Sequence, residues 1–411
     1  MIQPLRVVVA LACAGIALSA CSREATTPAP QAIGASLTVE PLTLPVPEGS
    51  GMPQLTVSGE RAIVSWIETS VAGASLKFAE RTDSGWSTPR TVASGTDWFV
   101  NWADVPSVLR LENGTLAAHW LKETDPAAEA YDVVMAFSKD DGKTWSAPVS
   151  PHHDATKTEH GFVSMFALPQ SKLGIVWLDG RQAVLDAANH NDNMSVRTAV
   201  FDDRGTQVSD TLVDDRVCEC CPTSAAITSD GPIVAYRDRS AEEIRDIAVT
   251  RFVNGAWTPA RIVHDDRWEI RACPVNGPAI SARGKTVAVA WFTAKDDDGR
   301  AFAAFSEDGG ATFGAPVRLD DGGSIGRVGI ALLDGGEAAA SWIERLDKRA
   351  ELRVRRVDAT GRRSPATTVS ALAGSRSSGF PRLVRRDREV IFAWTEPEGE
   401  RTTIRTASAR W

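Results

Sequence analysis

The chain has 411 residues and a formal net charge of −8, with 32 glycines, 22 prolines and 13 tryptophans. This length is sufficient for one large domain with a substantial core. The acidic balance argues against nucleic acid as a partner, because nucleic-acid-binding surfaces are normally basic.

The first twenty residues have the pattern of an export signal. Arg6 precedes an apolar run from Val7 to Ala20, which is short for a transmembrane helix. The run ends in Leu-Ser-Ala-Cys, which resembles a bacterial lipobox, so Cys21 is predicted to be the lipidated first residue of the mature protein. An ordinary signal peptide followed by a chance cysteine is the alternative. Because Ser22 rather than aspartate follows Cys21, the resemblance implies the bacterial outer membrane, facing the periplasm or the cell surface.

The composition changes again after the leader. Residues 21–36 are rich in alanine, threonine and proline, and we expect them to form a flexible tether between the membrane and the folded domain. Residues 37–411 are predicted to form a single domain. No segment after residue 20 is predicted to span a membrane.

A strand-like marker recurs seven times in this domain. Each marker is a short apolar run that ends in an aromatic residue, and these residues are Trp66, Trp120, Trp177, Tyr236, Trp291, Trp342 and Trp394. Their spacing varies from 51 residues, between Trp291 and Trp342, to 59 residues, between Trp177 and Tyr236. An apolar strand precedes each marker and an alternating strand follows it, and in all repeats but the last a short outer strand comes next. Four short strands per repeat are typical of a β-propeller blade.

We therefore predict an all-β fold, a β-propeller of seven four-stranded blades. The seventh repeat ends at Trp411, after only three strands. Residues 37–46 are predicted to supply the missing fourth strand, because this pairing closes the ring and removes an exposed strand edge.

A turn signature supports this prediction. Residues 138–145 (SKDDGKTW) and 306–313 (SEDGGATF) share the pattern Ser-x-Asp-x-Gly-x-Thr-aromatic, and weaker copies occur at 82–86, 253–257 and 357–361. We expect the aspartate to accept backbone N–H groups, the glycine to take a positive φ and the aromatic ring to insert into the core. The pattern resembles the Asp-box, or BNR repeat, of the sialidase (neuraminidase) superfamily. That resemblance implies a propeller, and makes six blades, the usual sialidase number, the alternative to seven.

One face of a propeller carries the loops that enter each innermost strand and the loops between second and third strands. Ligands usually bind on that face. We expect the wall of a pocket to include Asp179, Arg181, Arg237, Asp238 and Arg239, and a recognition site to expose tryptophans. The ligand-binding candidates are Arg181, Arg237, Arg239, Arg271, Arg327, Trp98, Trp102 and Trp268. The alternative is that these solvated loops are simply rich in charge.

The sialidase resemblance implies three arginines that hold a carboxylate, a tyrosine nucleophile activated by glutamate, and an aspartate as acid and base. The chain departs from this pattern, because it lacks the Phe/Tyr-Arg-Ile-Pro segment and has only Tyr131 and Tyr236. Tyr236 replaces a marker tryptophan, and Tyr131 comes too early in the chain. The remaining catalytic hypothesis is a carboxylate pair, formed by Asp179 with Asp238 or Glu344, that hydrolyses a glycosidic bond.

Four cysteines lie in two similar loops, at residues 213–222 and 264–274. They are Cys218, Cys220, Cys221 and Cys273, and both loops lead through Cys-Pro into an innermost strand. In an oxidising compartment, four thiols usually form two disulfides, and a bridge to Cys273 would link blade four to blade five. The alternative is a copper or zinc site with His160 or His153 as an extra ligand.

The sequence thus predicts a lipid-anchored monomer that recognises a glycan, another anion or a protein partner on its loop-bearing face. An active glycoside hydrolase of exo-sialidase type is one alternative. A metal-binding or redox protein built on the four cysteines is another.

Overall fold

The computed structural model describes residues 1, 33–34, 36–185, 193–347, 349–399 and 401–411. Apart from Met1, the predicted signal peptide lies outside these residues, as do the predicted lipidated Cys21 and most of the predicted tether. No helix in the described part of the chain has the length and apolar character needed to cross a bilayer.

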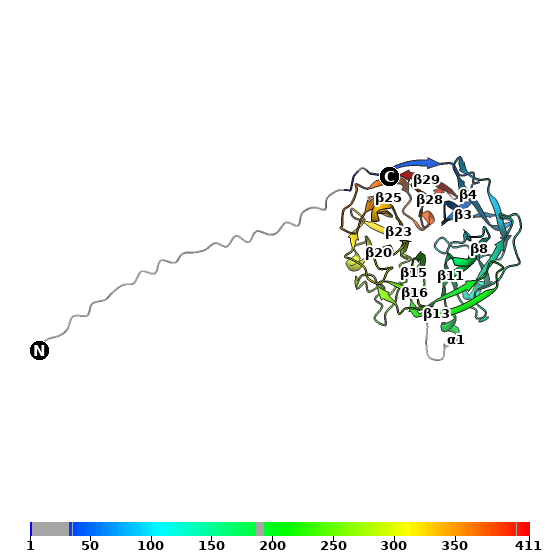
Figure 1. Ribbon diagram of the computed structural model, residues 1–411, viewed down its shortest axis with the longest axis horizontal. Coiled ribbons are helices and arrows are strands. Elements are labelled where there is room, and N and C mark those ends of the chain that lie inside the picture. Colours follow the sequence, from blue (N-terminus) through cyan, green and yellow to red (C-terminus); the bar gives the residue numbers. More distant parts are fainter. Residues whose placement is uncertain (2–32, 35, 186–192, 348, 400) are drawn as a thin grey trace.

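The chain folds into seven antiparallel sheets arranged in a ring in chain order (Figure 1). The first blade consists of β2 (Ser50–Ser58), β3 (Arg61–Ser70), β4 (Gly73–Thr82), β5 (Gly85–Trp86) and β6 (Arg90–Gly95). The second consists of β7 (Ser107–Arg110), β8 (Leu116–Asp125) and β9 (Ala130–Ser138). The third consists of β10 (His160–Leu168), β11 (Lys172–Asp179), β12 (Met194–Phe201) and β13 (Gln207–Val217).

Blade four consists of β14 (Ser224–Thr228), β15 (Gly231–Arg237), β16 (Ile247–Val253), β17 (Ala256–Trp257) and β18 (Arg261–Ile262), and blade five of β19 (Ala279–Arg283), β20 (Thr286–Thr293), β21 (Arg300–Ser306) and β22 (Val317–Arg318). Blade six consists of β23 (Ser324–Leu332), β24 (Ala338–Leu346), β25 (Arg349–Val357) and β26 (Thr367–Leu372). Blade seven consists of β27 (Arg382–Arg386), β28 (Glu389–Glu398), β29 (Arg401–Arg410) and β1 (Thr38–Leu42).

The described helical segments are short: α1 (Arg181–Leu185), η1 (Pro126–Ala128), η2 (Pro169–Ser171), η4 (Lys295–Asp297), η5 (Asp334–Gly336) and η6 (Arg376–Ser378).

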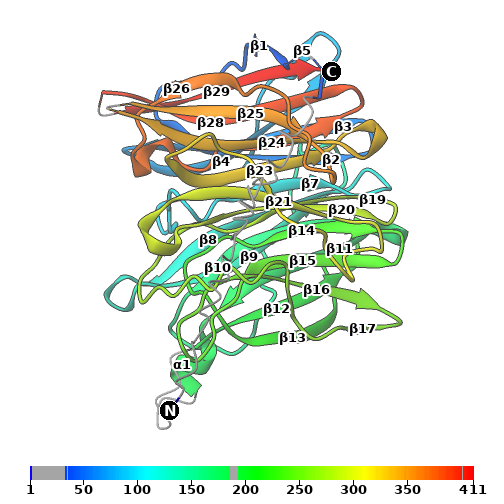
Figure 2. The same ribbon diagram turned by 90° about the vertical axis from the view of Figure 1, so that its left-hand side faces the viewer.

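The N-terminal strand closes the ring. β1 pairs antiparallel with β29, from Thr38 opposite Arg410 to Leu42 opposite Thr406, and Figure 2 shows the two strands side by side. The predictions of seven blades and of closure by the N-terminal segment are confirmed, and the six-blade alternative is wrong. Closure supplies hydrogen-bond partners for the outer edge of the last blade.

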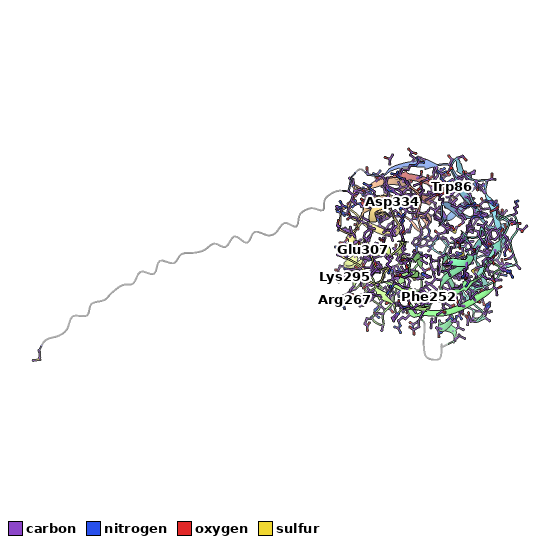
Figure 3. The ribbon with its side chains drawn as sticks, in the orientation of Figure 1. Trp86, Phe252, Arg267, Lys295, Glu307 and Asp334 are labelled. Atoms are coloured by element: carbon purple, nitrogen blue, oxygen red, sulfur yellow. A yellow bond between two sulfur atoms is a disulfide. The ribbon has the colours of Figure 1, made fainter. Side chains whose placement is uncertain are left out.

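The marker residues form the centres of the blades. Trp66, Trp177, Trp291 and Trp342 are completely buried on the second strands, and side chains fill the ring between the sheets (Figure 3). Several of these indoles donate to a carboxylate two residues further on, as Trp66 does to Glu68 at 3.0 Å. A buried indole N–H needs an acceptor, so an acidic residue at the end of the second strand has a structural role that recurs from blade to blade.

The two complete turn signatures have the expected geometry. Asp140 accepts the backbone N–H of Thr144 at 2.9 Å and its hydroxyl at 2.7 Å, while Gly142 has a φ of +79°. These bonds, led by the Thr144 N–H, lower the pKa of Asp140 to about 2. Trp145 then packs edge-on against Phe78 of the preceding blade, with ring centroids 6.1 Å apart. The same bonds form at Asp308, beside the exposed Glu307 labelled in Figure 3. The turn therefore fastens neighbouring blades together.

Candidate functional site

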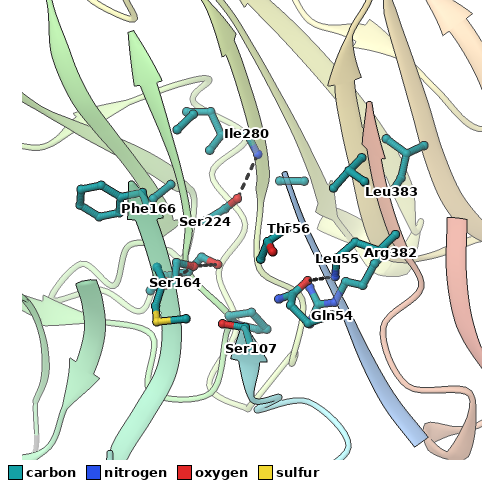
Figure 4. Close-up of a pocket in the computed structure, with 18 of the residues that line it drawn as sticks. Gln54, Leu55, Thr56, Ser107, Ser164, Phe166, Ser224, Ile280, Arg382 and Leu383 are labelled. Carbon is teal, nitrogen blue, oxygen red and sulfur yellow. Dashed lines mark hydrogen bonds between the residues drawn. The ribbon is translucent and has the colours of Figure 1, made fainter. Parts of the chain in front are cut away.

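The seven innermost strands enclose a cavity of about 420 Å³ (Figure 4). Its wall carries small polar side chains from several blades, including Thr56, Ser107, Ser164 and Ser224. Some of their hydroxyls are used by neighbouring strands; Ser164, for example, donates to the carbonyl of Thr223 at 2.9 Å. Among the described residues that line the cavity, only Arg382 is charged.

Arg382 is the first residue of β27, and its side chain extends into the cavity beside Gln54 and Leu55 (Figure 4). Its Nε is buried without a hydrogen-bond partner, and no carboxylate in the described chain lies within ion-pair distance of its guanidinium. Burial lowers the pKa of Arg382 to about 10, against the opposing effect of the charge on Asp104. The group therefore stays cationic at neutral pH. A half-buried cation without an anionic partner is unfavourable for folding alone.

Two further arginines lie at the same end of the channel. Within the described residues, the Arg327 guanidinium, on β23, donates only to the backbone carbonyls of Ser375 and Gly379, at 2.9 and 3.0 Å. Arg376 is exposed in η6 and has no carboxylate partner in the described structure. Burial, followed by the charge of Arg376, lowers the pKa of Arg327 to about 10, which still leaves it charged.

An aromatic pair holds these arginines together. Trp102, from the loop between blades one and two, stacks on Phe380, with ring centroids 5.6 Å apart and planes at 16°. Arg327 lies 4.9 Å and Arg376 lies 5.9 Å from the Trp102 ring, and Arg382 lies 5.5 Å from the Phe380 ring. We call Arg327, Arg376, Arg382, Trp102 and Phe380 the arginine–aromatic cluster. Guanidinium groups over aromatic faces are held in place without losing their charge.

Asp104 is the carboxyl group whose charge acts on the pKa of Arg382. It is 1% exposed; its Oδ2 accepts the Phe162 N–H at 2.7 Å and the Tyr131 hydroxyl at 3.4 Å, and its Oδ1 has no partner. Burial raises the pKa of Asp104 to about 7, although the Phe162 N–H opposes that rise. Near neutral pH this carboxyl is therefore only partly ionised and neutralises little of the charge on Arg382.

Asp179 and Arg181, predicted as pocket residues, are in direct contact with each other. Arg181 donates to both carboxylate oxygens of Asp179, at 2.7 and 2.6 Å, and lies 3.2 Å from Asp154. Asp179 is fully buried and also accepts the indole N–H of Trp177 at 2.8 Å. The charges on this side of the face are thus compensated within the protein.

Arg237 and Arg239 also have internal partners. Arg237 is 1% exposed and donates to the carbonyls of Asn276, Phe292 and Arg245, at distances from 2.6 to 2.9 Å. Arg239 binds Glu243 through two nitrogens, at 3.0 and 2.8 Å. Arg237 therefore cross-links three segments of the backbone and does not face a pocket.

The three predicted catalytic carboxylates belong to different blades. Asp238 directly follows β15 in blade four, and burial and then the charge of Asp214 raise its pKa to about 6. Glu344, at the end of the second strand of blade six, is buried and accepts Trp342 Nε1 at 2.8 Å and Arg353 at 2.5 Å. No contact in the described structure joins Asp179, Asp238 or Glu344 to one another. Each instead contacts groups of its own blade or of an adjoining loop.

The aromatic and remaining basic candidates differ in exposure. Trp268, which we expected to be exposed, is only 5% exposed, because it packs under Arg237 and edge-on against Phe292. Trp98 is half-buried and stacks on Trp120, with centroids 5.5 Å apart. Arg271 is well exposed and only 3.9 Å from Glu269.

The structure groups His160 with aspartates, whereas the sulfur atoms of Cys218, Cys220 and Cys221 gather in a separate group. His160 stacks on His152, with centroids 3.8 Å apart, and its two ring nitrogens lie 3.5 Å from Asp132 and 3.4 Å from Asp154. Burial lowers the pKa of His160, but the neighbouring carboxylates, led by Asp154, more than offset this and raise it overall. The cluster is a histidine–aspartate network between blades two and three.

The cysteines pair in part as predicted. Cys220 and Cys273 form a disulfide that joins the loops entering blades four and five. Cys218 and Cys221 are buried free thiols.

Sequence reasoning identified Arg327 and Trp102 but missed Arg376, Phe380 and Arg382. A usable signal lies at the residue after the proline that precedes an innermost strand. Ser107 and Ala279 occupy this position in blades two and five, and Arg382 occupies it in blade seven. An arginine where equivalent blades have small residues marks a position that faces the channel.

No protein-family model matches this chain, and no curated protein sequence matches it. Among solved structures, the polysaccharide lyase Uly1 is 9% identical and aligns over 88% of this chain and 89% of its own, with a TM-score of 0.55. The NanB sialidase from Streptococcus pneumoniae is 9% identical over 92% of this chain and 95% of its own, with a TM-score of 0.45. An ulvan lyase is 13% identical over 78% and 80%, with a TM-score of 0.48. At these identities the similarity shows the propeller fold alone.

Proposed function

We propose that this protein is a lipid-anchored, extracytoplasmic recognition propeller, acting as a monomer, that binds an anionic saccharide at the arginine–aromatic cluster. The observation that carries the proposal is that Arg327, Arg376 and Arg382 gather around one aromatic pair without a carboxylate partner in the described structure. Guanidinium groups match carboxylates and sulfates through paired hydrogen bonds.

The surroundings favour a sugar over a simple inorganic anion. The cavity that Phe380 and Arg382 help to line carries several hydroxyl groups among apolar side chains, and its volume of about 420 Å³ is within the range of small-ligand sites. Trp102 is half-buried and offers an apolar ring beside the cations. A uronic-acid or sulfated sugar presents the matching combination of anion, hydroxyl groups and apolar ring face. The polysaccharide lyase Uly1 shares the fold, which is compatible with a carbohydrate ligand.

Binding without glycoside hydrolysis is favoured, because hydrolysis needs two carboxyl groups on either side of one bond. In the described structure Asp179 and Glu344 are committed to buried indoles and arginines on separate blades.

The test uses the full-length protein in detergent and calorimetric titration with a uronic-acid oligosaccharide, a sulfated oligosaccharide and the carboxyl-reduced or desulfated form of each. We expect saturable binding of at least one charged form and loss of binding for its neutral counterpart. Arg327→Met and Arg382→Met should each weaken that binding, whereas Arg239→Met, which removes an internally paired arginine, should not. Equal binding of charged and neutral forms, or no binding of any charged form, would contradict the proposal.

Anchoring through Cys21 is a separate part of the proposal, and it rests on the lipobox-like sequence. Metabolic labelling with a fatty acid should modify the wild-type protein in the bacterial envelope and leave Cys21→Ala unlabelled. Equal labelling of both forms would show that the anchor lies elsewhere.

A further inference from the structure

The four cysteines place a free thiol next to a disulfide. Cys273 is exposed and Cys220 is half-buried, and together they form the disulfide between the two loops. Cys218 and Cys221 are each 1% exposed, and their sulfur atoms lie 3.1 Å apart. The Cys218 sulfur is also 3.8 Å from the sulfur of Cys220. Thiol–disulfide exchange requires this arrangement, in which a thiolate can reach one sulfur of an existing disulfide.

The charges around the two thiols distinguish them. Buried Arg245 donates to the Cys218 sulfur at 3.4 Å and is held by Glu219 at 2.8 Å and by Glu243 at 2.9 Å. The hydrogen bond from Cys221, assisted by the charge of Arg237, lowers the pKa of Cys218 to about 7. Burial raises the pKa of Cys221 well above its usual value. Cys218 is therefore the nucleophile of the pair and Cys221 stays protonated until the second step.

We propose that the four cysteines form an internal disulfide relay that moves the bond from the exposed Cys220–Cys273 pair to the buried Cys218–Cys221 pair. In the first step the Cys218 thiolate attacks the Cys220 sulfur, a Cys218–Cys220 bond forms, and Cys273 leaves as a thiolate that takes up a proton. In the second step Cys221 loses its proton and attacks the Cys218 sulfur, and Cys220 leaves and is protonated. One disulfide and two thiols are present before and after, so no external oxidant or reductant is required.

The relay is mechanically connected to the arginine–aromatic cluster through Asn276. The backbone N–H of Asn276 bonds to the Cys221 sulfur, and its carbonyl accepts two bonds from Arg237, at 2.9 and 2.7 Å. Its side-chain oxygen accepts the backbone N–H of Arg327 at 2.8 Å. The fit is tight, because a Cβ on Gly326 would lie 2.2 Å from that oxygen.

Opening the Cys220–Cys273 bond releases one end of the segment that holds Arg327. If the proposed anion binding is correct, the relay changes the affinity of that site. This consequence rests on the proposed function, whereas the disulfide exchange itself does not.

The test is disulfide mapping of the full-length protein, isolated without reductant. The protein is exposed to saturating bulky maleimide at pH 6 and pH 8, quenched in acid and analysed by peptide mass spectrometry. The relay predicts that two of the four propeller cysteines, Cys218 and Cys221, are free thiols at the outset. It then predicts that labelling of Cys273 is accompanied by a new Cys218–Cys221 disulfide, about tenfold faster at pH 8 than at pH 6, because the thiolate fraction of Cys218 rises between them. Absence of free thiols at both Cys218 and Cys221 at the outset would overturn the relay.

Two matched serine variants separate the steps. Cys218→Ser removes the nucleophile, so Cys273 should remain unlabelled because the Cys220–Cys273 bond stays intact. Cys221→Ser retains the first step, so labelled Cys273 should appear together with a Cys218–Cys220 bond. Thermal unfolding of both variants checks that they fold. Labelling of Cys273 in Cys218→Ser at the wild-type rate, or no labelling of Cys273 in the wild type while both buried thiols stay free, would also overturn the relay.

Discussion

The two sides of the loop-bearing face treat their arginines differently. In blades three and four, Arg181 and Arg239 are each bound by a carboxylate of the same loop region, at 2.6 to 3.0 Å. At the mouth between blades six and seven, no carboxylate in the described structure forms an ion pair with Arg327 or Arg382, and their neighbours include backbone carbonyls, aromatic rings and the cavity wall. An arginine that is paired with a carboxylate of the protein stabilises the conformation of its loop. Unpaired ones indicate where a ligand can supply the missing charge.

The difference has an energetic basis. A buried charge is tolerated when a partner and hydrogen bonds offset its lost hydration. Arg237 shows the extreme case, since its guanidinium donates to three backbone carbonyls and packs on the Trp268 ring. Arg382 lacks such compensation, so the fold gains little from it, and its charge is available to a ligand.

The largest expected effect concerns Arg237, on the blade three and four side, where the arginines have partners within the protein. Arg237→Met leaves three buried carbonyls without their donors, and we expect the free energy of unfolding to fall by about 3–5 kcal/mol. Denaturant unfolding of the full-length protein measures this change. A loss below about 1 kcal/mol would mean that Arg237 is not the structural cross-link described here.

The next effect concerns Asp104, near Arg382 and the other arginines that have no carboxylate partner in the described structure. Its pKa of about 7 in the folded state exceeds the ordinary value of 3.8, so the folded protein binds the extra proton between these values. Stability should therefore fall as the pH rises from about 4 to 7, by up to about 4 kcal/mol from this group. Asp104→Asn keeps an acceptor for Phe162 and should remove this part of the pH dependence.

The measurement for Asp104 is denaturant unfolding at pH 4.5 and pH 8 for the wild type, Asp104→Asn and Asp215→Asn, the last at an exposed position. Compared with the wild type, Asp104→Asn should increase the free energy of unfolding more at pH 8 than at pH 4.5. Asp215→Asn should show no such difference between the two pH values. The same pH dependence in all three proteins would contradict the assignment.

Arg382→Met should have the opposite pattern to Arg237→Met. We expect unchanged or increased stability, because a half-buried unpaired charge is removed, and a 10- to 100-fold weaker affinity for the charged oligosaccharide. Calorimetry and denaturant unfolding of the same preparation separate the two effects, and Arg382→Lys should give an intermediate affinity because a lysine lacks the paired donors. A strongly destabilised Arg382→Met with unchanged affinity would reverse the comparison.

The smallest effect is expected for Arg239→Met. Its i,i+4 pair with Glu243 is partly solvated, so the free energy of unfolding should change by less than about 1 kcal/mol. Affinity for the oligosaccharide should stay within experimental error. A tenfold loss of affinity would place the ligand on the blade three and four side instead.

The sequence was sufficient for the architecture because burial of one large aromatic per blade repeats at a regular interval, as at Trp177 and Trp342. The site was harder to predict from the sequence, because the same repeat also places structural carboxylates on several second strands, where a tryptophan needs an acceptor. Asp179 and Glu344 looked catalytic in isolation, but both lie two residues after a marker tryptophan and accept its indole N–H. Whether a loop arginine is paired depends on how the folded loops place its guanidinium relative to carboxylates and carbonyls, which spacing along the chain does not reveal.

The cysteines illustrate the same limit. Their position in two equivalent loops followed from the repeat, and so did a link between blades four and five. The pairing of Cys220 with Cys273, and the contact of Cys221 with Asn276, depend on the relative placement of those loops in space.

Arginine side-chain NMR tests the central claim most directly. The Nε–Hε signals of the full-length protein would be followed during titration with the charged oligosaccharide and, separately, with its neutral counterpart. We predict saturable shifts for Arg327, Arg376 and Arg382 with the charged form only, and no change for Arg181 and Arg239. Shifts confined to Arg181 and Arg239, or equal shifts with the neutral form, would contradict the account.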